Sequence, residues 1–320
     1  MFALSATPLC PPCESSLVKA PATMTSETHI LRAALWMLGA IGSFSAMAIA
    51  GREAGSTLDT FEIMTYRSLV GVAIVVTVIT ATGNWHAIKG QRLGQHLIRN
   101  LAHFTGQNLW FFAVTMIPLA QVFALEFTSP LWVVVLSPLI LGERLTRIRA
   151  FSAILGFVGI LIVARPSPDS LNAGVITAAS CAIFFALTVM FTKRLTRHEG
   201  IASILFWLTS MQLVMGLVMS GYDGVIALPD VTTLPWILTI GVAGLAAHFC
   251  FTKALSLAPA TAVVPIDFAR LPVIAILAML IYDEAVVIWT FVGAAVIFAA
   301  NYLNILEAAG KLGRKRPASS

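Results

Sequence analysis

The sequence has few charged residues. Only 11% of its 320 residues are Asp, Glu, Lys or Arg, whereas soluble domains carry roughly 25%. Hydrophobic residues make up 58% of the chain, and a soluble protein of this composition would expose large apolar patches to water. The shortage of charge therefore excludes a disordered chain and an ordinary soluble domain. It indicates a protein with many membrane-spanning helices.

Cysteine and the common chemical motifs are also scarce. Of the four cysteines, Cys10 and Cys13 form a C-P-P-C near the N-terminus, and Cys181 and Cys250 fall inside apolar runs. This spacing does not predict a disulfide framework. The sequence contains no HExxH and no GxxxxGK[ST] phosphate-binding loop, so we expect no metal, no cofactor and no ATP as a driving force.

The positive net charge of +5 arises from 20 basic and 15 acidic residues. The basic residues lie in short polar stretches and in the C-terminal tail, which is typical of cytoplasmic loops rather than of nucleic-acid binding. The expected partners are therefore the lipid bilayer and a small-molecule substrate, with no nucleic acid. Residues 1–29 are predicted to be a disordered cytoplasmic tail, and Met24 is an alternative start.

The apolar residues fall into ten continuous segments. Each is close to the roughly 20 residues that a helix needs to cross a bilayer. A spanning chain must form helices or a closed barrel, and continuous rather than alternating runs favour helices. We therefore predict an all-α polytopic membrane protein with ten transmembrane helices. The segments are residues 30–50, 61–81, 96–115, 119–141, 149–165, 172–192, 202–220, 234–256, 261–281 and 286–306.

The two halves of the chain align when one is shifted by 141 residues. Pro118 then falls on Pro259, and Glu126 falls on Asp267. The polar third segment falls on an apolar one, so we expect it to span with its polar residues turned inward. The predicted unit is five helices used twice, and because five is odd the second copy must be inverted in the membrane. The predicted domains are a first repeat at 30–165, a second at 172–306 and a basic cytoplasmic tail at 307–320.

The loop charges predict the orientation. If the N-terminus is cytoplasmic, basic residues concentrate in the inside loops, and only Arg52 and Arg165 lie outside. Such a bias in short loops sets membrane topology. We therefore expect a multi-pass protein of a bacterial cytoplasmic membrane with both termini in the cytoplasm.

Four stretches carry a resemblance to a known family. Each half resembles the EamA-type domain of the drug/metabolite transporter superfamily, and the resemblance covers about residues 30–306. The stretches are W-F-F-A-V-T-M-I-P-L-A-Q-V-F-A-L-E-F-T-S-P-L-W (110–132), L-I-L-G-E-R-L-T (139–146), F-T-K-A-L-S-L-A-P-A-T-A-V-V-P-I-D-F-A-R-L-P (251–272) and I-Y-D-E-A (281–285).

The resemblance implies ten helices in a 5+5 inverted repeat, a central cavity and secondary transport of small organic solutes. It says nothing about which solute is carried. Arg67 is similar to an arginine often seen in first halves of the family. Two positions depart from the pattern: Asp283 stands where the first half has Gly142, and the repeat mate of Arg67 is Leu208.

Ionisable residues within the spans are the first candidates for function. Such groups are costly in lipid and usually face a cavity or a partner. Glu126 and Asp267 lead, because the repeat places one in each half. They either line the cavity, bind substrate or exchange a coupling proton, or they are neutralised structurally, Asp267 by Arg270 one turn away and Glu126 by Arg67.

A polar stripe on the third segment supplies further candidates. Arg99, His103 and Gln107 recur every four residues, which places them on one helix face, and Trp110 continues that face. His248 holds the matching position in the second half. Either histidine serves in substrate or proton contact, or it is a satisfied interhelical hydrogen-bonding group. The full predicted substrate-binding set is Glu126, Asp267, Arg270, Arg67, His103, Gln107, Trp110, His248 and Trp207.

The leading functional hypothesis is a secondary transporter that moves a small organic metabolite or drug-like solute by alternating access. An intramembrane enzyme would need clustered acids at a membrane face or a metal motif. A channel or a ligand-binding module would need a filter motif or an extramembrane domain. The sequence shows none of these features, so we expect a transporter rather than an enzyme.

Overall fold

The computed structural model describes residues 26–141, 146–164, 172–195, 198–222, 224–257, 266–267, 269–285 and 287–308. Within these residues it contains eleven α-helices and one short 3-10 helix, and no strands. The predicted all-α class is therefore confirmed. Cys10, Cys13, Met24 and Glu143 lie outside the described residues, as does nearly all of the two predicted tails.

The first half contains six helices and the 3-10 turn. They are α1 (Ser26–Ala54), α2 (Thr60–Thr82), η1 (Trp85–Ala87), α3 (Leu93–Met116), α4 (Leu119–Glu126), α5 (Ser129–Leu141) and α6 (Arg147–Ala164). The second half contains α7 (Ala173–Leu195), α8 (Ile201–Ser220), α9 (Leu234–Leu257), α11 (Arg270–Tyr282) and α12 (Ile288–Ala308).

The helix boundaries repeat along the chain. Helices that begin at residues 60, 93, 129 and 147 in the first half recur at 201, 234, 270 and 288 in the second, each 141 residues later. The helices α5 and α11 match at both ends and contain 13 residues each. The internal repeat inferred from the sequence is therefore present in the backbone.

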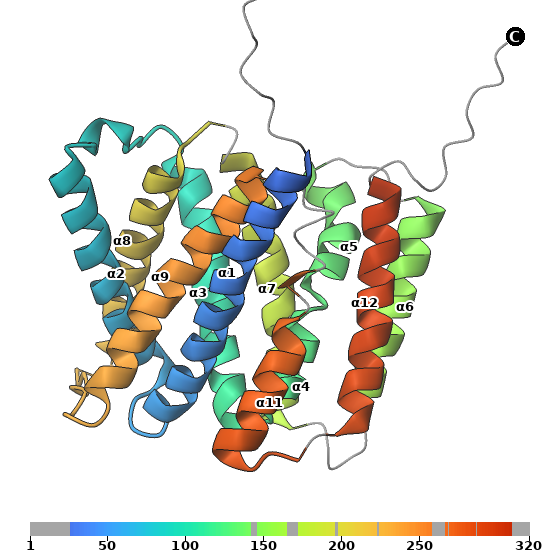
Figure 1. Cartoon of the computed structure of the whole chain (residues 1–320). Coiled ribbons are helices and arrows are strands. Elements are labelled where there is room, and N and C mark those ends of the chain that lie inside the picture. Colours follow the sequence, from blue (N-terminus) through green and yellow to red (C-terminus); the bar gives the residue numbers. More distant parts are fainter. Residues whose placement is uncertain are drawn as a thin grey trace, which may run out of the picture.

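The two repeats are interlocked rather than side by side. The most extensive contacts join α1 to α9, α3 to α7, α2 to α8 and α6 to α12 (Figure 1). Since α7 is the repeat mate of α1 and α9 is the mate of α3, the first two pairs are the same contact made twice. The other two pairs each join a helix to its own mate. All four pairs cross between the repeats, so groups from both halves meet in the interior.

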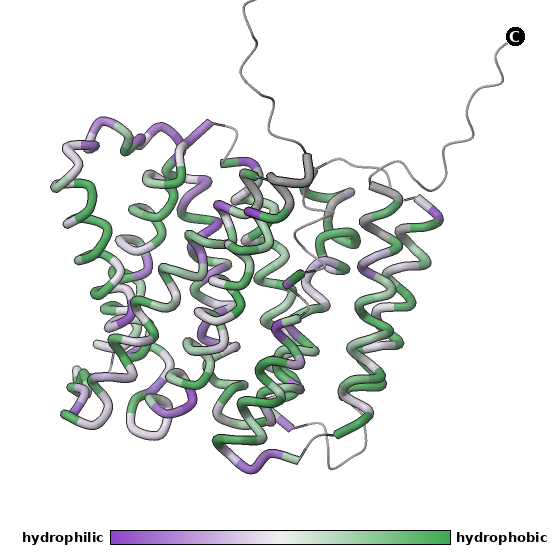
Figure 2. Tube along the Cα trace, viewed as in Figure 1, coloured by the Kyte–Doolittle hydropathy of each residue, from purple (hydrophilic) through white to green (hydrophobic). Residues whose placement is uncertain are grey.

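The exterior of the bundle is apolar. Side chains such as Leu139 and Leu280 are largely exposed, and Figure 2 shows hydrophobic residues along most of α6 and α12. Six stretches are long and apolar enough to cross a membrane, and α6, α11 and α12 contain shorter apolar stretches. The start of α1 and the end of α12 lie at the same end of the bundle (Figure 1).

The polar third segment, residues 96–115, forms most of α3, and its polar side chains point inward as predicted. His96, Arg99, Asn100, His103 and Gln107 are all buried, whereas the intervening leucines and isoleucine are about half exposed. A helix can bury one polar stripe and present apolar residues to lipid on its other faces. Its low mean hydropathy therefore reflects an inward polar face.

The predicted span at residues 119–141 is divided in the structure, although Leu119–Leu136 is still one stretch apolar and long enough to cross a membrane. The structure has two helices, α4 and α5, with a break at Phe127 and Thr128. Pro130 has no backbone N–H and cannot donate to the carbonyl of Glu126, so one helix cannot run through this point without losing a hydrogen bond. Glu126 therefore ends α4 rather than lying midway along a helix.

The break leaves backbone carbonyls that other residues satisfy. Asn301 of α12 donates to the carbonyl oxygen of Phe127 at 3.0 Å. The hydroxyl of Thr128 donates to the carbonyl oxygen of Leu125 at 2.7 Å. A non-helical backbone is tolerated at membrane depth when neighbouring groups replace its hydrogen bonds. In the second half α11 begins at Arg270, the repeat mate of Ser129, at the matching position.

Candidate solute-binding site

A cluster of three charged side chains forms where the break between α4 and α5 meets the start of α11. Arg270 donates to Glu126 Oε1 at 3.2 Å and to Asp267 Oδ2 at 3.0 Å. The cluster thus joins an acid from each repeat through one guanidinium. The expected pairing of Asp267 with Arg270 is present. Pairing of Glu126 with Arg67 is not, because Glu126 binds Arg270 instead.

Aromatic rings surround this acid cluster. The indole N–H of Trp110 donates to Glu126 Oε2 at 2.8 Å. The guanidinium of Arg270 lies 4.6 Å from the ring centroid of Phe44 and 5.0 Å from that of Phe123, within the range of cation–π attraction. Two buried polar atoms, Asp267 Oδ1 and Arg270 Nε, have no hydrogen-bond partner among the residues that the structure describes. The cluster therefore keeps polar capacity for a further group.

A second charged cluster lies between α2 and α3. Arg67 donates to Gln107 Oε1 at 2.9 Å. About two helix turns before Gln107 on α3, Arg99 donates to Asn100 Oδ1 at 2.7 Å and to the hydroxyl of Thr192 at 3.2 Å. Both arginines are at least 94% buried. Neither takes part in an ion pair among the described residues.

Two histidines and an aromatic ring connect the clusters. The ring centroids of His103 and His248 lie 5.3 Å apart, and His248 meets Phe44 edge to face at 5.6 Å. Phe44 in turn covers Arg270. His103 also lies on the same face of α3 as Arg99 and Gln107. Polar and aromatic groups therefore follow one another from Arg99 to Asp267, across both repeats.

Both histidines have unused hydrogen-bonding capacity. Neither ring nitrogen of His103, nor Nε2 of His248, has a partner among the described residues, and all three atoms are buried. Buried polar atoms of this kind normally find a protein or water partner. The predicted alternative of satisfied interhelical histidines has no support in these contacts.

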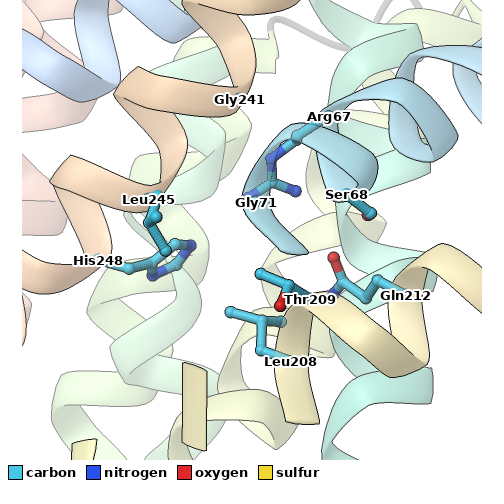
Figure 3. Close-up of a pocket in the computed structure, with 9 residues that line it drawn as sticks. All are labelled: Arg67, Ser68, Gly71, Leu208, Thr209, Gln212, Gly241, Leu245 and His248. Atoms are coloured by element: carbon cyan, nitrogen blue, oxygen red, sulfur yellow. The ribbon is translucent and has the colours of Figure 1, made fainter. Parts of the chain in front are cut away.

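A small pocket opens beside Arg67, between α2, α8 and α9. Arg67, Ser68, Thr209, Gln212 and His248 supply its polar lining, and Figure 3 shows Arg67 and His248 on opposite walls. Its volume is about 20 Å³, and one water needs roughly 10–15 Å³ on this measure. An organic metabolite needs more room, so the surrounding helices must separate before a solute can enter here.

Trp207 contacts the start of this path through its backbone, where its carbonyl oxygen accepts from Asn100 Nδ2 at 3.0 Å, and its side chain has a separate partner. Its indole N–H donates to the carbonyl oxygen of Lys89 at 2.8 Å. The same region contains a buried contact between His96 Nε2 and Glu199 Oε2 at 2.7 Å, and Ser203 donates to the same carboxylate oxygen at 2.7 Å. These bonds tie the loop before α3 to the start of α8, so Trp207 has a structural partner of its own.

The opposite end of the bundle is held by a second carboxylate. Glu284 pairs with Arg52 at the end of α1 and accepts from the backbone N–H of Leu119 at 3.0 Å, where α4 begins. A carboxylate at a helix N-terminus satisfies an otherwise free donor. This contact gives Glu284 a structural capping role.

Sequence reasoning missed two contributors to the path. Gln212 lines the pocket with an unpartnered Nε2, and Phe123 covers Arg270. Gln212 is a polar residue in an otherwise apolar segment, which was the available signal. Phe123 gave none, because a phenylalanine inside an apolar run does not differ from a packing residue.

Comparison with known proteins decides the family. A model of the EamA-like transporter family matches residues 31–165 and again residues 172–306. The chain is a member of this family. Both matches coincide closely with the repeats found above, so each match covers one of the two repeats.

Named transporters are among the relatives of this EamA-like protein. A riboflavin transporter of Brucella anthropi is 28% identical over 280 residues, which cover 86% of this chain and 98% of that protein. An S-adenosylmethionine uptake transporter of Rickettsia felis is 25% identical and covers 88% and 94%. A pseudopaline exporter of Pseudomonas aeruginosa is 27% identical over 224 residues and covers 69% and 77%. A solved crystal structure with 18% identity has the same fold at a TM-score of 0.60, covering 88% of this chain and 99% of that one.

Proposed function

We propose that this chain is a secondary transporter that carries a small organic solute along the path between Arg99 and Asp267. The observation that carries the proposal is the continuity of buried polar groups across both repeats. Inverted-repeat transporters bind their substrates near the interface of the repeats. Membership of the EamA-like family supports transport, and the different solutes named for its relatives leave the choice of solute to the site itself.

Glu126, Asp267 and Arg270 are the proposed centre of solute contact. One guanidinium shared by two carboxylates leaves a net negative charge when both acids are ionised. A cationic or hydrogen-bond-donating group of the solute can then replace part of the Arg270 contact. A proton taken up by either acid removes that surplus charge, which makes the pair a candidate for proton coupling. Trp110 and Phe44 provide flat apolar walls for the solute.

Alternating access is proposed to act through the interlocked helix pairs. The contact of Glu284 with Arg52 and Leu119 closes one end of the path. The pocket beside Arg67 is too small for a metabolite, so this conformation is closed around the path. Rocking of one repeat against the other would open the α1–α9 and α3–α7 contacts alternately, because these two contacts are equivalent under the repeat.

We propose ten spans with both helix-bundle termini in the cytoplasm. The supporting observation is that the connection between α2 and α3, which contains Lys89 and Arg92, lies at the same end of the bundle as the start of α1 and the end of α12 (Figure 1). Arg52 lies in the last turn of α1, at the other end of that helix. Reporter fusions after Arg316 test this orientation. A cytoplasmic signal is expected, and a periplasmic signal would contradict the ten-span topology.

Transport is tested with the purified full-length chain in proteoliposomes. A thermal-shift screen against amino acids, nucleosides and vitamins, including riboflavin and S-adenosylmethionine, selects solutes for uptake assays. We expect at least one stabilising solute to accumulate in the vesicles. Glu126→Gln should insert normally and lose most of this uptake. Uptake at the wild-type rate across pH 5.5–8 in that variant would remove Glu126 from the site.

A further inference from the structure

Among the residues that the structure describes, the cluster around Arg67 and Arg99 has positive charge without an acid in an ion pair. Both side chains are at least 94% buried. Arg67 lines the same pocket as His248, whose ring lies 5.3 Å from that of His103, on the α3 face that carries Arg99. The partners of the two arginines are neutral: Gln107 for Arg67, and Asn100 and Thr192 for Arg99. A buried charge without a counter-charge is costly. The described part of the chain does not supply this counter-charge, so a bound group has to.

Four acids that the structure describes in the bundle already have other partners. Glu126 and Asp267 share Arg270. Glu199 contacts His96 and Ser203, and Glu62 caps the start of α2 and accepts from the backbone of Ala227 at 2.7 Å. No ion pair that the structure describes brings any of these carboxylates to Arg67 or Arg99.

The cluster also has more hydrogen-bond donors than acceptors. A guanidinium carries five N–H donors and no acceptor, and the acceptor oxygen of Gln107 is already taken by Arg67. Gln212 adds an unpartnered Nε2 on the pocket wall, and both histidine rings add unpartnered nitrogens. Such a donor-rich set is complementary to a group with several acceptor oxygens and a negative charge, such as a carboxylate or a phosphate.

The repeat shows that the fold itself does not need these charges. The positions equivalent to Arg67 and Arg99 in the second half are Leu208 and Ile240, 141 residues later. Both apolar residues are buried in the equivalent helices α8 and α9. The position equivalent to His103 is Gly244, where a Cβ would lie 3.0 Å from Nε of Arg67. A glycine at this position therefore leaves room for the arginine.

We propose that Arg67 and Arg99, with Gln212 and His103, form a subsite for an anionic group of the solute, a carboxylate or a phosphate. This inference rests on the proposed transport function and narrows it to organic anions and zwitterions. The surplus negative charge of the Glu126–Asp267–Arg270 cluster lies at the other end of the path. A zwitterion would therefore bind with its anionic group at the arginines and its cationic group towards the acids.

The first test compares stability without any solute. Arg67→Gln and Arg99→Gln each remove an uncompensated buried charge and keep a hydrogen-bonding side chain. We expect both full-length variants to melt in detergent at or above the wild-type temperature. Arg194→Gln removes the same charge from an exposed position and should leave the melting temperature unchanged. If both buried-arginine variants melt below the wild type, the arginines are structural and the proposal is overturned.

The second test measures binding with matched probes. S-adenosylmethionine against its decarboxylated form tests a carboxylate, and flavin mononucleotide against riboflavin tests a phosphate, while inorganic phosphate and acetate test the bare anions. We expect an anionic probe to stabilise the wild type more than its matched partner does. Its affinity should fall roughly tenfold or more in Arg67→Gln and Arg99→Gln and stay unchanged in Arg194→Gln. If no anion stabilises the wild type more than it stabilises Arg67→Gln and Arg99→Gln, the proposal is overturned.

Proteoliposome uptake separates this inference from the proposed function. Anion binding that depends on Arg67, without uptake of any solute, would overturn the transport function and leave the anion subsite in place. Equal uptake of an anionic or zwitterionic solute by the wild type and Arg67→Gln would confirm transport and overturn the anion subsite.

Discussion

The two charged clusters of the path differ in how their charges are balanced. At the α4–α5 break and the start of α11, Arg270 contacts both Glu126 and Asp267, so each of these three charged groups has a partner of opposite sign. Between α2 and α3, the partners of Arg67 and Arg99 in the described part of the chain are all neutral. The comparison supports the proposals that the first cluster contributes to folding as well as to transport and that the second binds an anionic group of the solute. Substitutions should therefore affect the stability of the two clusters in opposite directions.

The largest effect is expected for Arg270→Gln. Removal of this guanidinium leaves two buried carboxylates facing each other without a counter-charge. Loss of one partner from a buried ion pair costs about 3–5 kcal/mol, so the melting temperature in detergent should fall strongly. Arg67→Gln is the matched control, because it removes the same side chain from the cluster without acids. Equal destabilisation by both variants would contradict the distinction between the clusters.

A smaller loss is expected for Glu284→Gln. The amide keeps an acceptor for the backbone N–H of Leu119 but loses the charge that pairs with Arg52. Loss of a hydrogen bond to a charged group costs about 1.5–3 kcal/mol, and partial exposure of the pair places the expected cost at the lower end. Thermal melting checks the stability. Accessibility of a cysteine introduced near Arg52 should rise in the variant, and unchanged accessibility would argue against closure of this end by Glu284.

Trp110→Phe should cost about 1 kcal/mol. The substitution removes the indole N–H that donates to Glu126 and keeps most of the buried ring. One neutral donor lost from a hydrogen bond has this typical cost. Uptake should fall more than stability, because the indole also orients the Glu126 carboxylate. A variant that loses stability but transports normally would show that Trp110 only packs.

Glu126→Gln should change stability by less than about 1 kcal/mol, since Asp267 remains as the counter-charge for Arg270. Its main effect falls on transport. Loss of a charge-assisted hydrogen bond to the solute lowers affinity by roughly tenfold to a hundredfold. We expect uptake to lose its pH dependence between pH 5.5 and 8, measured in proteoliposomes with a fixed internal pH. Retention of the wild-type pH profile would assign proton coupling to another group.

The smallest effect is expected for Asp230→Ala, outside the path. Thr233 and Thr232 donate to this exposed carboxylate and lower its pKa. A lowered folded-state pKa contributes stability above the unfolded value near 3.8, and this contribution is lost as the pH falls through the folded value. The melting difference between variant and wild type should therefore be constant at neutral pH and shrink only below about pH 4. A difference that changes between pH 5.5 and 8 would contradict this assignment.

Much of the architecture can be predicted from local sequence patterns. The apolar runs specify the membrane class, and the 141-residue offset specifies the repeat, because both depend on residue type and spacing alone. The inward polar face of α3 also follows from spacing, since Arg99, His103 and Gln107 recur at the helical period. The pairing of Asp267 with Arg270 follows for the same reason, because the two residues are one helix turn apart.

What only the tertiary structure decided is which groups meet across the two repeats. The sequence left two readings open for Glu126, and the structure assigns Arg270, 144 residues away, as its partner in place of Arg67. It also placed the helix break at Phe127, where Asn301 of a distant helix replaces the lost hydrogen bond. The sequence could not show that no described carboxylate pairs with Arg67 or Arg99, because it does not tell which acids lie near them in space. Charge balance in a low-dielectric interior depends on the positions of the groups in space, and the interlocked packing of α1 with α9 and α3 with α7 sets those positions.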